Sequence, residues 1–357
     1  MKNTIVTIVG ARPQFIKAAP VSRALREHCT EFLVHTGQHY DTNMSQLFFD
    51  ELGIPAPDVN LEIGSGPHGQ QTGHMLTAVE KVLQRERPDL VMVYGDTNST
   101  LAGAIAAAKM NIPIAHVEAG LRSFNSLMPE EINRVLTDRI SNLLFCPTAT
   151  AVKHLAAEGI TEGVHLTGDV MYDAALHFAE QARVKSRILQ ALKLAARSFV
   201  LATVHRAQNT DEAQILQRIV EAMLASGKTI VFPVHPRTRG FLQKYGLLER
   251  LSQQERIRVI EPVGYLDMIQ LEQAAERILT DSGGVQKEAY FFKTPCITMR
   301  DETEWTETVT DGWNLLAGTD REKILQGLVE FQPQQKQNNH YGDGHAGEKI
   351  AELLQKD

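Results

Sequence analysis

The 357-residue chain has few cysteines, no excess of positive charge and no long apolar run. Cys29, Cys146 and Cys296 lie far apart with no Cys-x-x-Cys pair, which argues against a disulfide framework or a zinc site and favours a reducing compartment. No apolar stretch reaches the roughly 18 residues that a transmembrane helix needs. The apolar part of the N-terminus is also too short for a signal peptide. We therefore expect a cytoplasmic protein.

The charge balance excludes some classes of partner. Lys and Arg number 36 against 43 Asp and Glu, the net charge is −7, and no polybasic run occurs. Neither nucleic acid nor a membrane is expected as a partner, and an anionic ligand would need local clusters of positive groups. The histidines show no His-x-x-His or His-Glu-x-x-His spacing, so we predict no metal and no other cofactor.

Short β-branched apolar runs alternate with helix-length segments, which is typical of right-handed βαβ units and parallel sheets. The strands expected in the first half are 5–9, 31–35, 90–93, 113–117, 142–145 and 164–166, with helices over 13–26, 69–87, 99–109 and 129–140. The pattern pauses near Gly168, a polar helical stretch covers 172–197, and strands resume at 199–203, 229–233, 257–260, 277–279 and 296–299. The segment 331–342 is expected to be a loop, and 344–355 a last amphipathic helix.

This alternation predicts an α/β protein with two doubly wound parallel-sheet domains facing a cleft. The domains are expected at residues 1–168 and 169–343, with a C-terminal helix in 344–357. Ligands of such sheets bind at the carboxyl ends of the strands, so the residues that directly follow strands are the most informative.

Two strand ends could bind phosphate. Gly10-Ala11-Arg12-Pro13 lacks the G-x-G-x-x-G of dinucleotide folds, but Arg12 and Lys17 would lie near a helix N-terminus, which attracts anions. In Asp281-Ser282-Gly283-Gly284, the glycines would let backbone N–H groups approach a diphosphate. Glu288, one turn further along, could accept hydrogen bonds from ribose hydroxyls. The alternatives are surface charges at Arg12 and Lys17, and a plain helix N-cap at Ser282.

Three acidic residues are candidates for proton transfer. Asp96 and Glu118 follow consecutive expected strands, and Glu130 opens the next helix. Crowding and burial raise the pKa values of neighbouring carboxyls, so one could hold a proton while another acts as a base. Alternatively, Asp96 and Glu118 cap turns, and Glu130 begins an i, i+4 ion-pair series with Arg134 and Asp138.

Two histidines follow strands of the second domain. His205 precedes Arg206, and His235 precedes Pro236 and Arg237. An imidazole at either position could stabilise a departing phosphate oxygen, whereas a purely structural histidine is the alternative.

Taken together, these stretches resemble the non-hydrolysing UDP-N-acetylglucosamine 2-epimerase family. The resemblance rests on Gly95-Asp96-Thr97, Glu118-Ala119-Gly120-Leu121-Arg122, Pro129-Glu130-Glu131-Ile132-Asn133-Arg134 and Ser282-Gly283-Gly284, and it covers nearly the whole chain. It implies a glycosyltransferase-B-like fold of two Rossmann-like domains whose last helix crosses back to the first. It also implies a homodimer as the expected assembly.

The resemblance assigns roles to individual positions. Residues implied to hold UDP are Arg12, His205, Ser282, Gly283, Gly284 and Glu288. Residues implied to surround the sugar are Lys17, Asp96, Glu118, Glu130, Arg134 and Arg300. His235 and Tyr265 are further candidates for binding the substrate.

The implied reaction removes the hydrogen at C2 while UDP leaves C1, and UDP then adds back to the glycal with a proton delivered to the opposite face. Departure of UDP builds oxocarbenium character at C1 and so acidifies an otherwise inert C–H bond. A carboxylate within reach can then take the proton. The residues alone do not assign base and acid among Asp96, Glu118 and Glu130.

Variant motifs are similar to the branch that acts on UDP-2,3-diacetamido-2,3-dideoxyglucuronate in surface polysaccharide synthesis, including lipopolysaccharide O-antigen. These variants are Gly-Ala-Arg-Pro-Gln-Phe at 10–15 and the segments 37–45 and 293–305. Gln38 and His39 match a regulatory loop of the family, but Gln70 or Gln71 stands where an Arg is expected. Alternatives are epimerisation of UDP-N-acetylglucosamine to UDP-N-acetylmannosamine, glycosyl transfer on the same fold, and a non-catalytic sugar-nucleotide sensor.

Overall fold

The computed structural model describes residues 3–38, 53 and 56–356. These residues divide into two compact units, one formed by residues 1–176 with 339–357 and the other by 177–338. The expected boundary at residue 168 falls just before helix α7 (Val170–Lys185), whereas the division between the units lies inside that helix. Among the described residues, no helix is both long and apolar enough to cross a membrane.

Unit 1 is built on a parallel sheet with the order β3-β2-β1-β4-β5-β6-β7 among the described residues. Its strands are β1 (Thr4–Val9), β2 (Thr30–His35), β3 (Val59–Asn60), β4 (Leu90–Tyr94), β5 (Ile114–Val117), β6 (Leu143–Cys146) and β7 (Val164–Leu166). The order places β1, β4 and β5 side by side in the middle, in register from Ile5 with Leu90 and from Val91 with Ile114. The residues that follow these three strands therefore meet at one edge of the sheet.

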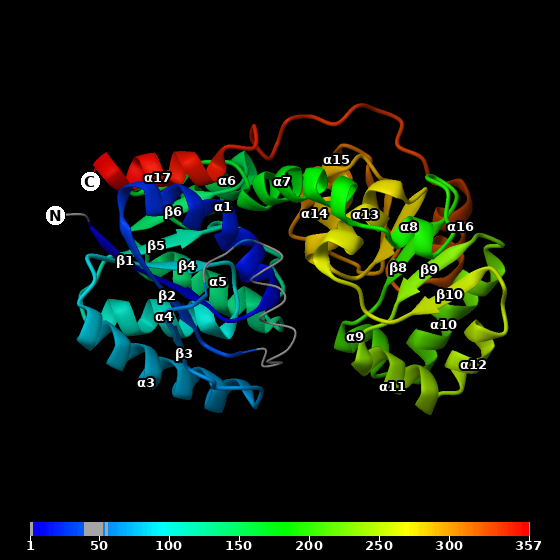
Figure 1. Cartoon of the computed structure of the whole chain (residues 1–357), viewed down its shortest axis with the longest axis horizontal. Helices are drawn as coiled ribbons and strands as arrows, with labels where there is room; N and C mark the ends of the chain where they lie inside the picture. Colours follow the sequence, from blue (N-terminus) through cyan, green and yellow to red (C-terminus); the bar gives the residue numbers. More distant parts are fainter. Residues whose placement is uncertain (1–2, 39–52, 54–55, 357) are drawn as a thin grey trace. The chain divides into compact units, whose positions relative to one another are not determined.

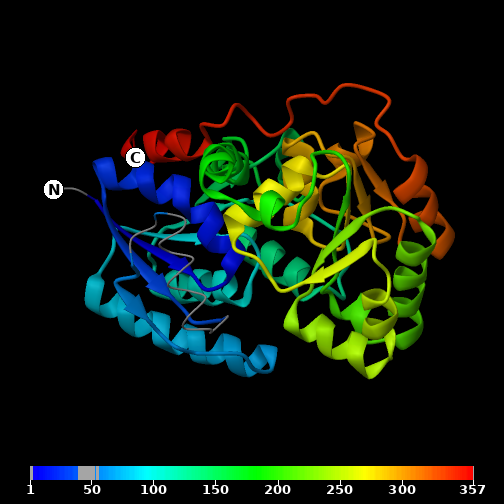
Figure 2. The same cartoon turned by 45° about the vertical axis from the view of Figure 1, so that its right-hand side comes forward.

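Helices cover both faces of this sheet. They are α1 (Arg12–His28), α3 (His68–Glu86), α4 (Asn98–Lys109), α5 (Pro129–Ile140), α6 (Ala149–Ala157) and α17 (Ala346–Lys356), together with the start of α7. A core of aliphatic side chains joins β1, β2, β4 and β5 to α3 and α4. On the other face, α17 packs beside α1, so the end of the chain belongs to unit 1 (Figures 1 and 2).

Unit 2 has a second parallel sheet with the order β10-β9-β8-β11-β12-β13. The strands are β8 (Val200–Thr203), β9 (Ile230–Pro233), β10 (Ile257–Ile260), β11 (Arg277–Thr280), β12 (Cys296–Thr298) and β13 (Asn314–Leu316). Strands β8 and β11 are neighbours, which brings the segments after Thr203 and Thr280 together. These are the segments that carry His205 and Ser282.

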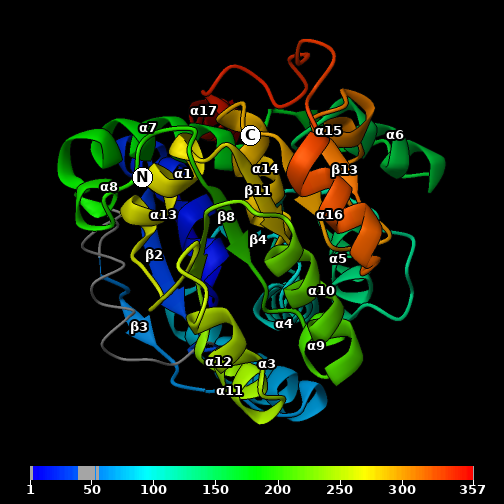
Figure 3. The same cartoon turned by 90° about the vertical axis from the view of Figure 1, so that its right-hand side faces the viewer.

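Two apolar cores lie on opposite faces of the second sheet. One packs against α10 (Ala213–Ala225), α11 (Pro236–Lys244), α12 (Leu247–Ser252) and α16 (Arg321–Glu330). The other packs against α13 (Tyr265–Ala274) and α14 (Gly283–Phe291), and Figure 3 shows this unit toward the viewer. The short helices α8 (Ile188–Ala191), α9 (Ala207–Thr210) and α15 (Thr306–Thr310) complete the unit.

The expected α/β class with two parallel sheets is confirmed, and most expected strands are found within one or two residues of their predicted bounds. The prediction of one continuous helix over 172–197 is wrong in its second part, because α7 ends at Lys185. The Ser186 hydroxyl bonds to Asp267 and accepts the Ile188 N–H, and Lys193 and Arg197 have positive φ, so the chain turns instead of continuing. Strands β3 and β13 were not predicted. The loop over 331–342 is confirmed.

Candidate functional site

Lys17 and Glu118 form a buried ion pair in unit 1. Lys17 lies on the second turn of α1, Glu118 directly follows β5, and their exposed fractions are 8% and 5%. The two side chains come together because β1 and β5 both flank β4. The site therefore holds a carboxylate whose charge is balanced by a neighbouring ammonium.

The backbone around this pair adopts a strained conformation. Glu118 has φ of 71°, in the left-handed region that a non-glycine residue enters at a cost of about 1–2 kcal/mol. Gly95 has φ of 61°, and a Cβ there would lie 2.9 Å from Lys17 Nζ and 3.2 Å from Glu118 Oε2. Gly95 is therefore required for the turn after β4 to approach the ion pair closely.

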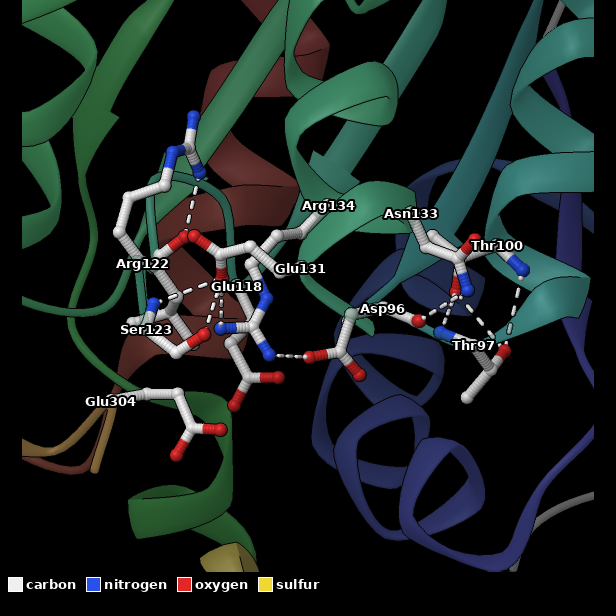
Figure 4. Close-up of polar contacts among 12 residues, drawn as sticks. Asp96, Thr97, Thr100, Glu118, Arg122, Ser123, Glu131, Asn133, Arg134 and Glu304 are labelled. Carbon is white, nitrogen blue, oxygen red and sulfur yellow. Dashed lines mark hydrogen bonds and ion pairs between the residues drawn. The ribbon is translucent and has the colours of Figure 1, made fainter. Parts of the chain in front are cut away.

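A second ion pair joins Asp96 to Arg134 of α5 in the same unit (Figure 4). Arg134 Nη2 lies 2.5 Å from Asp96 Oδ2, and Arg134 Nη1 lies 3.2 Å from Glu131 Oε2. The Asn133 amide donates to the Asp96 carbonyl at 2.9 Å. Helix α5 thus holds the Asp96 turn through consecutive side chains. A quarter of the Asp96 side chain stays exposed.

Glu131 was not among the predicted site residues. Its carboxylate accepts hydrogen bonds from the Ser123 N–H and hydroxyl, both at 2.9 Å (Figure 4). It also accepts the Phe124 N–H at 3.0 Å. It therefore ties the 123–124 loop to Arg134. Glu130, by contrast, is exposed on the first turn of α5. Arg134 forms ion pairs with Asp96 and Glu131, and among the described contacts none joins it to Glu130 as in the i, i+4 alternative.

Gln14 is another residue that the sequence did not single out. Its side-chain oxygen accepts from the N–H groups of Gly10 and Ala11, at 2.8 and 3.0 Å. Its amide donates to the Tyr94 carbonyl at 2.8 Å and to the Thr100 hydroxyl at 3.0 Å. A single buried amide thus connects the turn after β1, which leads to Arg12, with the end of β4. The i, i+3 spacing from Ala11 is the one sequence signal, as in a capping box.

The candidate regulatory residues are only partly within the described structure. Gln38 accepts hydrogen bonds from the Ser99 N–H and hydroxyl, at 3.1 and 2.7 Å, and His39 lies outside the described residues. Gln71 is buried, donates to the Gly64 carbonyl at 2.7 Å and accepts from the Asn98 amide at 2.8 Å. Gln70 is exposed. The buried Gln71 is therefore engaged in holding α3 to α4.

In unit 2, His205 pairs with Asp281. His205 Nδ1 lies 3.0 Å from Asp281 Oδ1, and the carboxylate also accepts the N–H groups of His205 and Arg206 and the Asn209 amide, each at 3.0 Å. Burial alone would raise the pKa of Asp281, but the His205 ring and these N–H donors bring it below its ordinary value. Asp281 thus orients His205, whose side chain is 45% exposed and leaves Nε2 for a ligand.

Helix α14 begins with the Ser282-Gly283-Gly284 motif. The Ser282 side chain caps the helix by accepting the Val285 N–H, as the N-cap alternative supposed. Gly283 and Gly284 put two residues without side chains at the first turn, where the helix dipole favours an anion.

Glu288 is buried on the same helix and accepts a hydrogen bond from the Tyr265 hydroxyl at 2.7 Å. This contact brings together two predicted site residues from α14 and α13. A second acid, Glu272, is fully buried on α13, and neither of its oxygens has a hydrogen-bond partner in the described structure. Burial raises the pKa of Glu272 well above its ordinary value, and the charge of Glu288 raises it further.

Arg300 and His235 each have a local partner. Arg300 is buried and forms a two-pronged ion pair with Glu304, at 2.9 and 3.2 Å. His235 is exposed and caps α11 by accepting the Arg237 N–H at 3.2 Å. No group of three His, Cys, Asp or Glu residues that could hold a metal ion is found in the part of the chain that the structure describes.

Comparison with known proteins gives consistent similarities over the whole chain. A family model described as UDP-N-acetylglucosamine 2-epimerase matches residues 23–355. A UDP-N-acetylglucosamine 2-epimerase homolog of Methanococcus maripaludis is 57% identical over 98% of this chain and 99% of its own. The UDP-2,3-diacetamido-2,3-dideoxy-D-glucuronate 2-epimerase of Pseudomonas aeruginosa is 52% identical, over 99% of both chains.

A solved structure extends the similarity to the fold. The UDP-GlcNAc 2-epimerase of Methanocaldococcus jannaschii, in complex with UDP-GlcNAc and UDP, superposes with a TM-score of 0.92 at 46% identity and covers 100% of both chains. The expected glycosyltransferase-B-like fold with two α/β domains is confirmed.

Proposed function

Because this chain belongs to the UDP-N-acetylglucosamine 2-epimerase family and is therefore an isomerase acting on a UDP-sugar, we propose that it inverts C2 of UDP-2,3-diacetamido-2,3-dideoxy-D-glucuronate. The variant motifs at 10–15, 37–45 and 293–305 support this substrate, as does the relative from P. aeruginosa. The alternative substrate is UDP-N-acetylglucosamine, which the relatives from Methanocaldococcus and Methanococcus favour.

Two carboxylates directly after β4 and β5 are the main structural support for C2 inversion. Asp96 and Glu118 lie at neighbouring strand ends, each in an ion pair with a cation of the same unit. We propose that they exchange the C2 proton together with Glu130, which is open to solvent. A carboxylate in hydrogen-bond reach of C2 contributes about 10² to 10⁴ in rate.

The residues of unit 2 are proposed to hold UDP and to assist its departure. The first turn of α14, with Ser282, Gly283 and Gly284, suits the diphosphate because backbone N–H groups and the helix dipole stabilise negative charge. With Nδ1 donating to Asp281, His205 would also donate from Nε2 to a phosphate oxygen in its doubly protonated form. Glu288 would accept from the ribose hydroxyls. Arg12, Arg300, Tyr265 and His235 are proposed as further substrate contacts.

The reaction type is tested by incubating the protein with each UDP-sugar in D₂O. Deuterium at C2 of both epimers, detected by mass spectrometry and NMR, is the expected result. A glycosyltransferase would instead release UDP only with an acceptor and leave C2 unlabelled. A nucleotide sensor would bind the UDP-sugar without turnover.

The substrate is tested by comparing kcat/KM for the diacetamido-glucuronate and for UDP-N-acetylglucosamine. We expect at least about a hundredfold preference for the uronate, about 2.7 kcal/mol in transition-state binding. Equal or faster turnover of UDP-N-acetylglucosamine would reject the substrate while leaving the reaction type intact.

We further propose a cytoplasmic homodimer that acts in the synthesis of a surface polysaccharide such as O-antigen. The three buried free cysteines support a reducing compartment. The dimer rests on the family resemblance, and light scattering of the purified protein measures it directly.

A further inference from the structure

His116 is a fully buried histidine on β5 that no proposed step uses. Its Nδ1 lies 2.7 Å from Asp138 Oδ1, and its Nε2 lies 2.7 Å from the Gly95 carbonyl oxygen. A backbone carbonyl only accepts hydrogen bonds, and so does an ionised carboxylate. Both ring nitrogens therefore need a proton if Asp138 is ionised.

The surroundings of Asp138 favour its ionised form. Oδ2 accepts from the Gly120 N–H at 3.1 Å and from Arg122 Nη1 at 2.7 Å, so both oxygens are engaged by donors. Burial would raise the pKa of Asp138, but His116 and Arg122 together bring it below its ordinary value. Protonation of Asp138 would remove its ion pair with Arg122 and add no hydrogen bond.

None of the other titratable groups described near this cluster supplies the second ring nitrogen of His116 with a different hydrogen-bond partner. Glu158 pairs with Arg122 from the other side, at 2.6 Å. Burial would lower the pKa of Arg122, but Glu158 and Asp138 raise it overall, so it stays charged. Burial and the Asp138 charge raise the pKa of Cys146 to about 12, which leaves that thiol neutral.

We propose that His116 is a positioning residue that is present as an imidazolium hydrogen-bonded to both Asp138 and the Gly95 carbonyl. Its positive charge lies at the base of the turn that bears Asp96, on the strand that directly precedes Glu118. The Gly95 turn transmits its effect, because Gly95 lies against Lys17 and Glu118 on one side and precedes Asp96 on the other. The effect on turnover rests on the proposed epimerase function, whereas the charge state of the ring rests on the hydrogen-bond geometry alone.

The charge state is tested without turnover, by ¹⁵N NMR of the histidine rings in the full-length protein at neutral pH. We expect both nitrogens of His116 to carry a proton, because each contacts an acceptor oxygen. His154 is the internal control, because its Nδ1 contacts the Gly120 carbonyl at 3.0 Å and its ring is only partly buried. The contact with the Gly120 carbonyl needs a proton on one ring nitrogen of His154 only. An unprotonated His116 nitrogen at neutral pH would overturn the proposal.

Two variants separate the charge from the contact with Gly95. His116→Gln keeps an N–H donor for the Gly95 carbonyl, and Asp138→Asn keeps an oxygen for Gly120 and Arg122 while allowing His116 to become neutral. In both, we expect the acid limb of the kcat–pH profile to move up by about one pH unit, a roughly tenfold loss of kcat at acidic pH. The base holds its proton more tightly once the nearby positive charge is gone, and KM changes little.

His154→Gln is the matched control and should leave the profile unchanged. Unchanged profiles in both His116→Gln and Asp138→Asn would also overturn the proposal. If His116→Gln does not fold, Asp138→Asn and the NMR measurement on the parent protein still decide. If no variant or parent turns over any UDP-sugar, the proposed function fails while the NMR result stands by itself.

Discussion

Adjacent glutamates at the start of α5 have opposite environments. The exposed Glu130 is the proposed proton-transfer residue, and the buried Glu131 holds the 123–124 loop and Arg134. Replacing each by Gln keeps the shape but removes the charge and one acceptor oxygen, so the two variants compare a solvent-exposed site with a hydrogen-bonded one at neighbouring positions.

We expect Glu130→Gln to lower kcat by about 10² or more, with a free energy of unfolding within about 0.5 kcal/mol of the parent. Glu131→Gln should instead lower the free energy of unfolding by about 1–3 kcal/mol, because one acceptor oxygen becomes an NH₂ group and the hydrogen bonds accepted from two N–H groups, a hydroxyl and an arginine lose the charge or the acceptor. Urea denaturation and steady-state kinetics measure both. A normal kcat for Glu130→Gln would remove it from the proposed proton transfer.

Glu272 gives a prediction about pH and stability. Its folded-state pKa is raised, first by burial and then by Glu288, so the folded protein holds this proton more tightly than the unfolded chain. Its contribution to stability is present at low pH and is lost as pH rises through the folded-state pKa, with a slope of about 1.4 kcal/mol per pH unit.

Glu272→Gln should remove that loss, so the variant gains stability over the parent as pH rises. Chemical denaturation at a series of pH values measures the difference. Glu249→Gln, an exposed change on α12, is the control and should track the parent. A constant difference between Glu272→Gln and the parent across pH would contradict the predicted ionisation.

At the scale of elements, the end of the chain is fixed by one buried carboxylate. Asp173 of α7 accepts the Gly347 N–H at 2.8 Å and so anchors the first turn of α17, which packs on α1. Burial raises the pKa of Asp173 from 3.8 to about 6, although the backbone N–H groups of Gly347 and Ala346 act to lower it.

As the pH rises from about 4 to about 6, the parent protein should therefore lose stability relative to Asp173→Asn. The asparagine keeps an acceptor oxygen without the charge. A shift from 3.8 to about 6 corresponds to at most about 3 kcal/mol. Thermal unfolding across this range measures it, with Glu352→Gln on the exposed side of α17 as the control. Parallel curves for Asp173→Asn and the parent would show that Asp173 does not titrate there.

At the scale of the whole molecule, unit 2 is proposed to bind UDP and unit 1 to exchange the proton at C2. If unit 2 holds UDP, then UDP alone should slow hydrogen exchange at residues 205–206 and 282–288, because binding to the native state suppresses local opening. The strand ends that carry Asp96 and Glu118 should respond less to UDP than to the intact UDP-sugar. Equal protection of both units by UDP would contradict this division.

Much of the architecture could be predicted from the chain because alternating apolar runs set the strands and helices, and parallel sheets place strand ends along one edge. The nearness of Asp96 to Glu118 followed from consecutive strands, and His205 and Ser282 were found because each follows a strand. Strand β3 was missed because it has only two residues, and β13 because its sequence Asn-Leu-Leu contains no β-branched residue.

The α/β class and the family follow from local patterns and motifs, which also supply the candidate residues for the chemistry. The partner of each side chain depends on the folded chain: Lys17 pairs with Glu118, Arg134 with Asp96 and Glu131, and His116 with Asp138 and Gly95. Except for Arg134 with Glu131, which are three residues apart on one helix, these contacts join residues far apart in the sequence. Their partners are selected by sheet order and burial, which no local pattern encodes.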